Sequence, residues 1–196
     1  MSVETNPKKG DWDEGYALDI HTISSTHVGD NEYGHPIFAT TRSPLGELLY
    51  QLKYRADPAA TEPIVEAVRE FLTKSGWNFE LIVPMPSSTG QRKLQPVIEI
   101  ARGLSRVLNT PLCEKCVLKV KSTPQLKNIY DFSERQRILA GAFAVSKRET
   151  AGKRLLLFDD LYRSGATMSA VARVLKGDGG ARSVYALALT YTRSNV

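Results

Sequence analysis

The chain has 196 residues, of which 42% are hydrophobic and 24% are charged, and its formal net charge is +5. This size and composition suit one compact α/β domain and exclude wholesale disorder and the fibrous classes. No apolar run is long enough to cross a bilayer, and the polar N-terminus lacks a secretion signal. The sequence therefore predicts a cytoplasmic protein with no membrane partner. The positive charge favours anionic partners, either phosphorylated metabolites or nucleic acid, without choosing between them.

The two cysteines of the chain, Cys113 and Cys116, are spaced as C-x-x-C. A structural zinc site needs four ligands, and the three histidines lie far upstream, at positions 21, 27 and 35. A thioredoxin-like redox pair would open a helix, whereas this segment leads into a predicted strand. We therefore expect two ordinary thiols that take no part in the chemistry of the protein.

The first 42 residues are predicted to form a tail and a small appended unit. Residues 1–15 are polar, contain Gly and Pro and lack periodicity, which predicts a loose tail. Residues 16–42 are predicted to form a hood: a half-buried strand around Leu18, turn residues at 29–34 and a returning strand at Pro36–Thr40. Residues 43–196 then form the main domain.

Two amphipathic helices are predicted to open the main domain. Ser43-Pro44 provides a capping hydroxyl followed by a proline at the first helical position, and leucines recur at helical spacing as far as Leu52. This helix ends near Lys53-Tyr54-Arg55, which could reach a phosphate but for which we expect a structural use. A second helix begins near Thr61 and stops at Gly76.

From residue 81 onward, predicted strands and helices alternate. The strands are apolar throughout, which is typical of strands covered on both faces and predicts a mostly parallel sheet flanked by helices. The expected strands are 81–84, 117–120, 142–145, 154–158 and 184–191, and the expected helices are 97–108, 133–139 and 167–176. The polar segment 121–131 is expected to be mobile. The predicted fold class is therefore α/β, in a single domain.

The segment from Leu155 to Thr167 carries the candidate chemistry. A buried strand delivers two adjacent carboxylates, Asp159 and Asp160, at its C-terminal end, where open parallel sheets bind ligands. A Ser-Gly-Ala-Thr turn then opens a helix, whose unpaired N–H groups and partial positive charge suit a phosphate. Because carboxylates repel phosphate, we expect the acids to bind hydroxyls or a metal. A ribose 5-phosphate meets both requirements, and the plainer alternative is a polar strand end before an ordinary turn.

The run LLLFDDLYRSGAT resembles the signature of type I phosphoribosyltransferases, and the wider chain is similar to their ComF/GntX branch. The wider similarity is carried by LYQLKYR at 49–55, IVPMP at 82–86, TPQ at 123–125 and SERQRILAGAF at 133–143. The resemblance implies the type I phosphoribosyltransferase fold and binding of 5-phosphoribosyl 1-pyrophosphate (PRPP) together with Mg²⁺. It implies that Asp159 and Asp160 bind ribose hydroxyls. It further implies that the 5-phosphate lies against Arg163, Ser164, Gly165, Ala166 and Thr167.

A second set of residues is expected to hold the pyrophosphate. The turn after the strand at 81–84 supplies backbone amides and hydroxyls, and basic side chains follow it. These residues are Pro86, Ser87, Ser88, Arg92 and Arg135. For Arg135, an ordinary solvated charge is an equal alternative. No protein side chain is expected to bind the metal by itself, because the diphosphate and the ribose hydroxyls would chelate Mg²⁺.

Three functions remain open, of which the least favoured is a regulator that binds a nucleotide or sugar phosphate and has no part in DNA uptake. The first is a Mg²⁺-dependent transferase of nucleotide metabolism, which moves the phosphoribosyl group to an unknown acceptor. The second is a ComF-like competence protein that senses PRPP or binds single-stranded DNA during DNA uptake, without turnover. Arg163 stands where purine-specific relatives carry an aspartate, and an arginine cannot act as a general base, which disfavours purine salvage. The N-terminal region has no cysteine, so the zinc module of many ComF proteins is not expected. Any of the three could form a homodimer.

Overall fold

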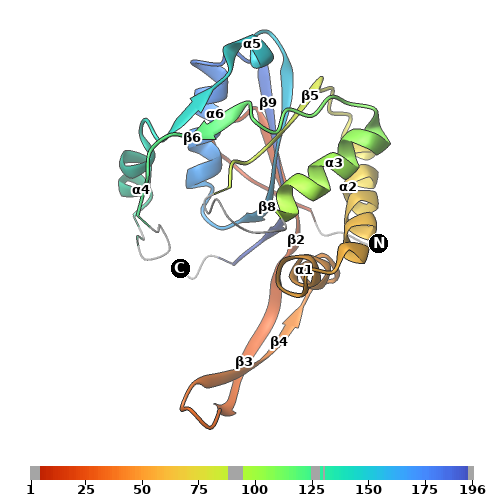
Figure 1. Ribbon diagram of the computed structural model, residues 1–196, viewed down its shortest axis with the longest axis vertical. Coiled ribbons are helices and arrows are strands. Elements are labelled where there is room, and N and C mark those ends of the chain that lie inside the picture. Colours follow the sequence, from red (N-terminus) through yellow and green to blue (C-terminus); the bar gives the residue numbers. More distant parts are fainter. Residues whose placement is uncertain (1–4, 88–94, 125–128, 130, 194–196) are drawn as a thin grey trace.

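A five-stranded sheet forms the centre of the molecule in the computed structural model, which describes residues 5–87, 95–124, 129 and 131–193 (Figure 1). The strand order is β1-β2-β9-β8-β5. The short edge strand β1 (Asn6–Pro7) is antiparallel to β2 (Glu14–Ile20). The strands β2, β9 (Ser183–Tyr191), β8 (Arg154–Tyr162) and β5 (Leu81–Pro84) run parallel to one another. The predicted α/β class with a mostly parallel sheet is therefore confirmed.

Helices cover both faces of this sheet. On one face lie α1 (Pro44–Tyr50), α2 (Thr61–Ser75) and α3 (Pro96–Leu108), and on the other lies α6 (Ala166–Lys176) with the small sheet of β6 (Val117–Lys119) and β7 (Phe143–Val145). The connections contain the π-helical segment Gln51–Arg55, a 3₁₀ turn at Pro58–Ala60, α4 (Phe132–Leu139) and α5 (Lys147–Thr150). Most of the predicted ends of helices and strands in the main domain agree with the structure to within one or two residues.

Strand β8 shows why an uninterrupted apolar run predicts a parallel strand. Leu155 and Leu157 contribute to one hydrophobic cluster, and Leu156 and Phe158 contribute to the other, all with no exposed surface. Because side chains alternate between the two faces of a strand, a strand packed on both faces must be apolar at every position. After Arg154 at its start, β8 therefore carries no charged residue until Asp159 and Asp160 near its C-terminal end.

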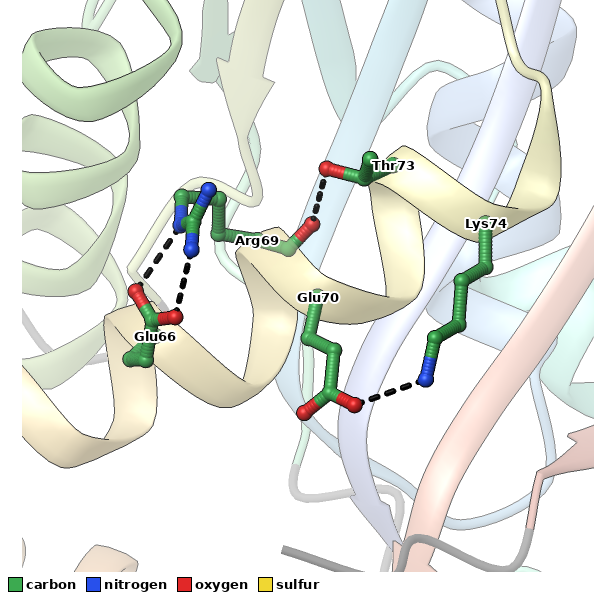
Figure 2. A network of polar contacts seen from close by, with 5 residues as sticks. All are labelled: Glu66, Arg69, Glu70, Thr73 and Lys74. Atoms are coloured by element: carbon green, nitrogen blue, oxygen red, sulfur yellow. Dashed lines mark hydrogen bonds and ion pairs between the residues drawn. The ribbon is translucent and has the colours of Figure 1, made fainter.

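Helix α2 shows the opposite pattern, with one apolar and one charged face. Its buried side chains pack against the sheet, while the outer face carries two ion pairs, Glu66–Arg69 at 2.6 Å and Glu70–Lys74 at 2.7 Å (Figure 2). Such exposed pairs contribute little to stability, so the buried face is what holds the helix in place. The helix ends at Gly76 with φ 69°, as predicted from the glycine.

The N-terminal segment differs from the loose tail predicted for residues 1–15. The Trp12 side chain is 7% exposed, and its indole Nε1 donates a 2.9 Å hydrogen bond to the carbonyl oxygen of Lys8. Asp11 and Asp13 form 2.9 Å ion pairs with Arg173 and Lys176 of α6. The physical reason is burial of the large Trp12 side chain, which fixes the polar residues around it.

The predicted hood over residues 16–42 is also divided differently. Strand β2 belongs to the central sheet, where it pairs in parallel with β9, because Ala17 and Leu18 are fully buried between the two helical layers. The hairpin consists instead of β3 (Thr22–Asp30) and β4 (Pro36–Arg42), which pair antiparallel and extend away from the body (Figure 1). Nearly all residues of this hairpin are exposed or half-exposed.

The prediction of two free thiols is wrong, because Cys113 and Cys116 form a disulfide. Their Cα atoms lie 5.5 Å apart, within the range that a disulfide requires. The backbone N–H of Cys113 donates to Ile82 and the carbonyl of Cys116 accepts from Ser146, so the turn is held at both ends. The spacing in the sequence could not reveal this turn. Of the polar segment 121–131, residues 125–128 and 130 lie outside the described residues.

Within the described ranges, no helix has the length and apolar character needed to span a membrane.

Candidate functional site

Strand β8 places Asp159 and Asp160 at the C-terminal edge of the sheet. The strand pairs with β9 beyond the predicted end at Phe158, as far as Tyr162 opposite Tyr191. The carbonyl oxygen of Asp160 accepts a 3.0 Å hydrogen bond from the Thr190 hydroxyl. These contacts hold the backbone of the acidic pair within the sheet, so the two carboxylates occupy defined positions.

Lys53 is the cationic partner of this acidic pair. Its Nζ lies 2.7 Å from Oδ2 of Asp160, and the side chains are only 15% and 12% exposed. Lys53 belongs to a π-helical segment, Gln51–Arg55, that continues α1 and ends at Ala56 with φ 51°. The sequence marked Lys53 by its position after the leucine stripe and by the LYQLKYR resemblance, and neither signal predicts a carboxylate partner more than one hundred positions away.

The two carboxyl groups differ in their electrostatic environment. Burial raises the pKa of Asp159 to about 8, and the neighbouring charge of Asp160 acts in the same direction. A 2.8 Å hydrogen bond from the backbone N–H of Asp160 and the charge of Lys53 oppose this shift. Two carboxylates that share one ammonium group repel each other, so Asp159 holds its proton more tightly than an exposed aspartate.

His21 lies behind the acidic pair and is not a candidate acid at neutral pH. Its Nδ1 lies 3.2 Å from the Thr190 hydroxyl. Burial, together with the positive charges of Lys53 and Arg42, lowers the pKa of this imidazole below its ordinary value. The ring is therefore predominantly neutral at pH 7.

The loop after β8 forms a small anion-sized cavity. Gly165, with φ 74°, is the N-cap residue of α6 and has no side chain to cap the helix, and the Ser164 hydroxyl accepts a long, 3.5 Å hydrogen bond from the backbone N–H of Ala166. The cavity has a volume of about 120 Å³ and is lined by Asp159 and residues 161–168. A second element supports the loop, because Nε2 of Gln136 on α4 donates a 3.0 Å hydrogen bond to the carbonyl oxygen of Ala166. A helix N-terminus beside a cavity suits a phosphate.

A larger cavity of about 380 Å³ adjoins the small one. Asp159, Leu161 and Thr167 line both cavities, so the two are continuous around these residues. The larger cavity is completed by residues from three other elements: Lys53 and Tyr54 after α1, Met85, Pro86 and Ser87 after β5, and Gln95–Ile98 at the start of α3. A ligand with a phosphate at one end and a polar group at the other could occupy both.

The predicted site residues fall into three groups. The acidic pair, the loop Arg163–Thr167 and the turn Pro86–Ser87 all line the two cavities. Arg135 does not line either cavity, and its guanidinium Nε donates instead to the carbonyl oxygen of Ile129. Ser88 and Arg92 lie outside the described residues.

The described part of the chain holds no cluster of three or more His, Cys, Asp or Glu side chains that could bind a metal ion. A divalent cation at the acidic pair would therefore need further ligands from a bound molecule. Phosphate and hydroxyl oxygens are suitable ligands for Mg²⁺.

Comparison with solved structures finds chains with a similar fold. Adenine phosphoribosyltransferase from Saccharomyces cerevisiae is 13% identical with a TM-score of 0.47, over 85% of this chain and 85% of that one. Glutamine PRPP amidotransferase from B. subtilis is 14% identical with a TM-score of 0.49, over 81% of this chain. UMP synthase from Leishmania donovani is 14% identical with a TM-score of 0.42, over 82% of this chain. The matched regions span 34% of the amidotransferase and 27% of the synthase.

No protein-family model matches the chain, and a search of curated proteins finds no match either.

Proposed function

We propose that this protein binds PRPP and transfers its phosphoribosyl group to an acceptor. The observation that carries the proposal is the pair of adjoining cavities, one at the N-terminus of α6 and one at the carboxylates of Asp159 and Asp160. The small cavity suits a monophosphate, and the carboxylates suit the hydroxyls of a sugar. In PRPP these groups belong to one molecule, with the 5-phosphate next to the ribose.

Different residues of the site would bind the 5-phosphate, the ribose hydroxyls and the diphosphate of PRPP. In the smaller cavity, the backbone N–H groups at the start of α6 and the hydroxyls of Ser164 and Thr167 would bind the 5-phosphate. Asp159 and Asp160 would accept hydrogen bonds from the ribose 2- and 3-hydroxyls. The turn at Pro86–Ser87, on another wall of the larger cavity, would bind the diphosphate. This arrangement fixes the sugar at three points, which orients its C1 carbon towards an acceptor.

The reaction would break the bond from C1 to the diphosphate oxygen and form a bond from C1 to the nucleophilic atom of the acceptor. Pyrophosphate leaves with the bonding electrons, and the acceptor gives up a proton if it carries one. The donor set of the site fits a Mg²⁺ ion that enters with the ligand, since two carboxylates are too few to bind it alone. When bound, Mg²⁺ would neutralise part of the charge that develops on the leaving pyrophosphate.

The acceptor must be one that can lose its proton without Arg163 acting as a base. Arg163 is exposed and lines the smaller cavity, and its guanidinium offers hydrogen-bond donors but no acceptor. A purine acceptor that depends on an acidic residue at this position is therefore disfavoured. Pyrophosphate release with a panel of nucleobases and small amines would identify the acceptor.

The decisive experiment is calorimetric titration of PRPP with Mg²⁺ into three proteins. We expect the unaltered protein to bind in the micromolar range, the double variant Asp159→Asn/Asp160→Asn to bind undetectably, and the control Asp178→Asn to bind like the unaltered protein. Asp178 is exposed in the turn after α6 and lines neither cavity. Unchanged affinity in the double variant would refute the proposed site.

Turnover is tested separately by pyrophosphate release in the presence of PRPP, Mg²⁺ and a panel of nucleobases and amines. Release with one acceptor supports a transferase. Binding of PRPP without release across the panel would instead favour a PRPP sensor. A titration of single-stranded DNA at increasing salt tests the DNA-binding alternative, because such binding weakens steeply with ionic strength.

A further inference from the structure

The ion pair between Lys53 and Asp160 lies inside the larger cavity, and the proposed function gives Lys53 no contact with PRPP. The ammonium group of Lys53 contacts Oδ2 of Asp160 at 2.7 Å, and both side chains are largely enclosed. Lys53, Asp160 and Ser87 line the same cavity. The cation therefore shares one enclosed space with the carboxylates that would bind ribose and with the turn that would bind the diphosphate.

Lys53 is the only lysine or arginine that lines the larger cavity within the described part of the chain. An enclosed site for a diphosphate needs positive charge, because moving several negative charges out of water is costly unless they are paired. Pro86 has no backbone N–H, and the peptide dipole at Ser87 is not a full charge. Among the described residues that line the larger cavity, Lys53 is the side chain that can supply it.

The local structure lets the ammonium group move while its backbone stays in place. The neighbouring Leu52 is fully buried, and the π-helical turn that carries both residues is closed by Ala56 in a left-handed conformation. Lysine carries a point charge on a flexible four-carbon stem with three donors, so it can exchange one oxygen partner for another by rotating its side chain. A bound diphosphate carries more negative charge than one carboxylate and would attract the ammonium more strongly.

We propose that Lys53 is the diphosphate ligand of this protein, held by Asp160 until the ligand arrives. In the unliganded protein, Lys53 neutralises Asp160. When the ribose hydroxyls occupy the carboxylate, the ammonium transfers to the diphosphate oxygens. This inference rests on the proposed function and adds to it a residue that selects ligands with a diphosphate at C1 over ligands without one.

The test compares two ligands that differ only at C1, PRPP and ribose 5-phosphate, each titrated with Mg²⁺ into the unaltered protein and into Lys53→Met. We expect Lys53→Met to weaken PRPP binding about tenfold or more, which corresponds to loss of one charge-assisted contact. We expect the affinity for ribose 5-phosphate to be unchanged or higher, because this ligand no longer competes with an internal cation. The ratio of the two dissociation constants is the measured quantity.

Arg55→Met is the matched control. Arg55 lies on the same π-helical turn, but its guanidinium lies 5.8 Å from the centre of the Tyr50 ring and does not line the cavity. The Arg55→Met substitution removes one positive charge from the same segment, and it should leave the affinities for PRPP and ribose 5-phosphate within about twofold of those of the unaltered protein. A second variant, Lys53→Gln, keeps a donor for Asp160 without the charge. If Lys53→Met fails to fold, Lys53→Gln replaces it in the test and should show the same selective loss of PRPP affinity.

Three results would overturn the inference. Equal weakening of both ligands would mean that Lys53 only orients Asp160. Equal strengthening of both would mean that Lys53 only blocks the site. No change in either affinity would mean that Lys53 has no role in binding. If the unaltered protein binds ribose 5-phosphate and PRPP undetectably, the proposed function itself fails, which is a different outcome from a changed ratio.

Discussion

A β-carbon on Gly165 would lie 2.4 Å from the hydroxyl oxygen of Tyr162. The aromatic ring thus packs directly beneath the glycine that opens α6, and the Trp12 ring packs against it edge-on with centroids 6.4 Å apart. The loop that would bind a phosphate is therefore supported from below by the N-terminal segment. Its shape depends on residues more than one hundred and fifty positions upstream as much as on its own sequence.

Gly165→Ala tests this contact. The substitution adds a collision with Tyr162 to the cost of a left-handed φ, so we expect it to lower the free energy of unfolding by about 2–3 kcal/mol. Gly152→Ala is the matched control, because Gly152 has nearly the same φ of 73° but nothing within 4 Å of the added carbon. The control should cost about 1 kcal/mol in urea denaturation. Equal costs at the two positions would show that the Tyr162 contact is unimportant.

Trp12→Ala tests whether the N-terminal segment is part of the fold. The Trp12 side chain is buried in the cluster that contains Leu157 and Val171, so its removal should cost about 3–5 kcal/mol of unfolding free energy. Trp12→Phe keeps most of the packing and loses the indole hydrogen bond to Lys8, and it should cost about 1–2 kcal/mol. Both are measured by urea denaturation. A loose tail would make both variants as stable as the unaltered protein.

Asp159→Asn should alter how stability depends on pH. The pKa of Asp159 is raised in the folded protein to about 8, above its ordinary value in the unfolded chain. Between these two values the folded state binds more protons, so Asp159 makes stability fall as pH rises through this window. The asparagine variant lacks this loss and should gain stability relative to the unaltered protein from pH 5 to pH 8.

Urea denaturation at several pH values provides the measurement for Asp159, and Asp178→Asn provides the control. Asp178 is exposed, and its variant should follow the unaltered protein at every pH. If the difference between Asp159→Asn and the unaltered protein stays constant from pH 5 to pH 8, the environment assigned to Asp159 is incorrect.

Thiol titration tests the disulfide. With Cys113 and Cys116 paired, the unfolded but unreduced protein should react with no thiol reagent, and two thiols should appear after reduction. Because the chain has two cysteines, two reactive thiols before reduction would restore the expectation drawn from the sequence.

The local elements near the site were predictable because their determinants are close together along the chain. The run from Leu155 to Phe158 is apolar at every position, and Gly165 follows it at the start of an amphipathic helix. These patterns depend on neighbouring residues and on the alternation of strand side chains. The same holds for Ser43, whose hydroxyl accepts a 3.0 Å hydrogen bond from Gly46 as an N-cap should.

Apart from the local Cys113–Cys116 disulfide, the features that the sequence could not reveal depend on residues that are distant in the chain. Residues 5–15 are polar, yet Trp12 anchors them on α6. The sequence of strand β2 resembles half of a hairpin, yet the strand joins the central sheet beside β9. There its two faces pack into the two hydrophobic clusters, one on each side of the sheet. Arg135 has the charge expected of an anion ligand, but α4 places it away from both cavities.

The sequence by itself determined the α/β class, the strand that ends in two acids and the glycine-containing turn after it, because each is a local pattern of hydrophobicity, charge and backbone freedom. Only the tertiary structure decided that Lys53 pairs with Asp160. It also decided that the N-terminal segment supports the loop through Tyr162. These contacts require the chain to close on itself, and the free energy that selects them comes from burial that no short stretch of sequence contains.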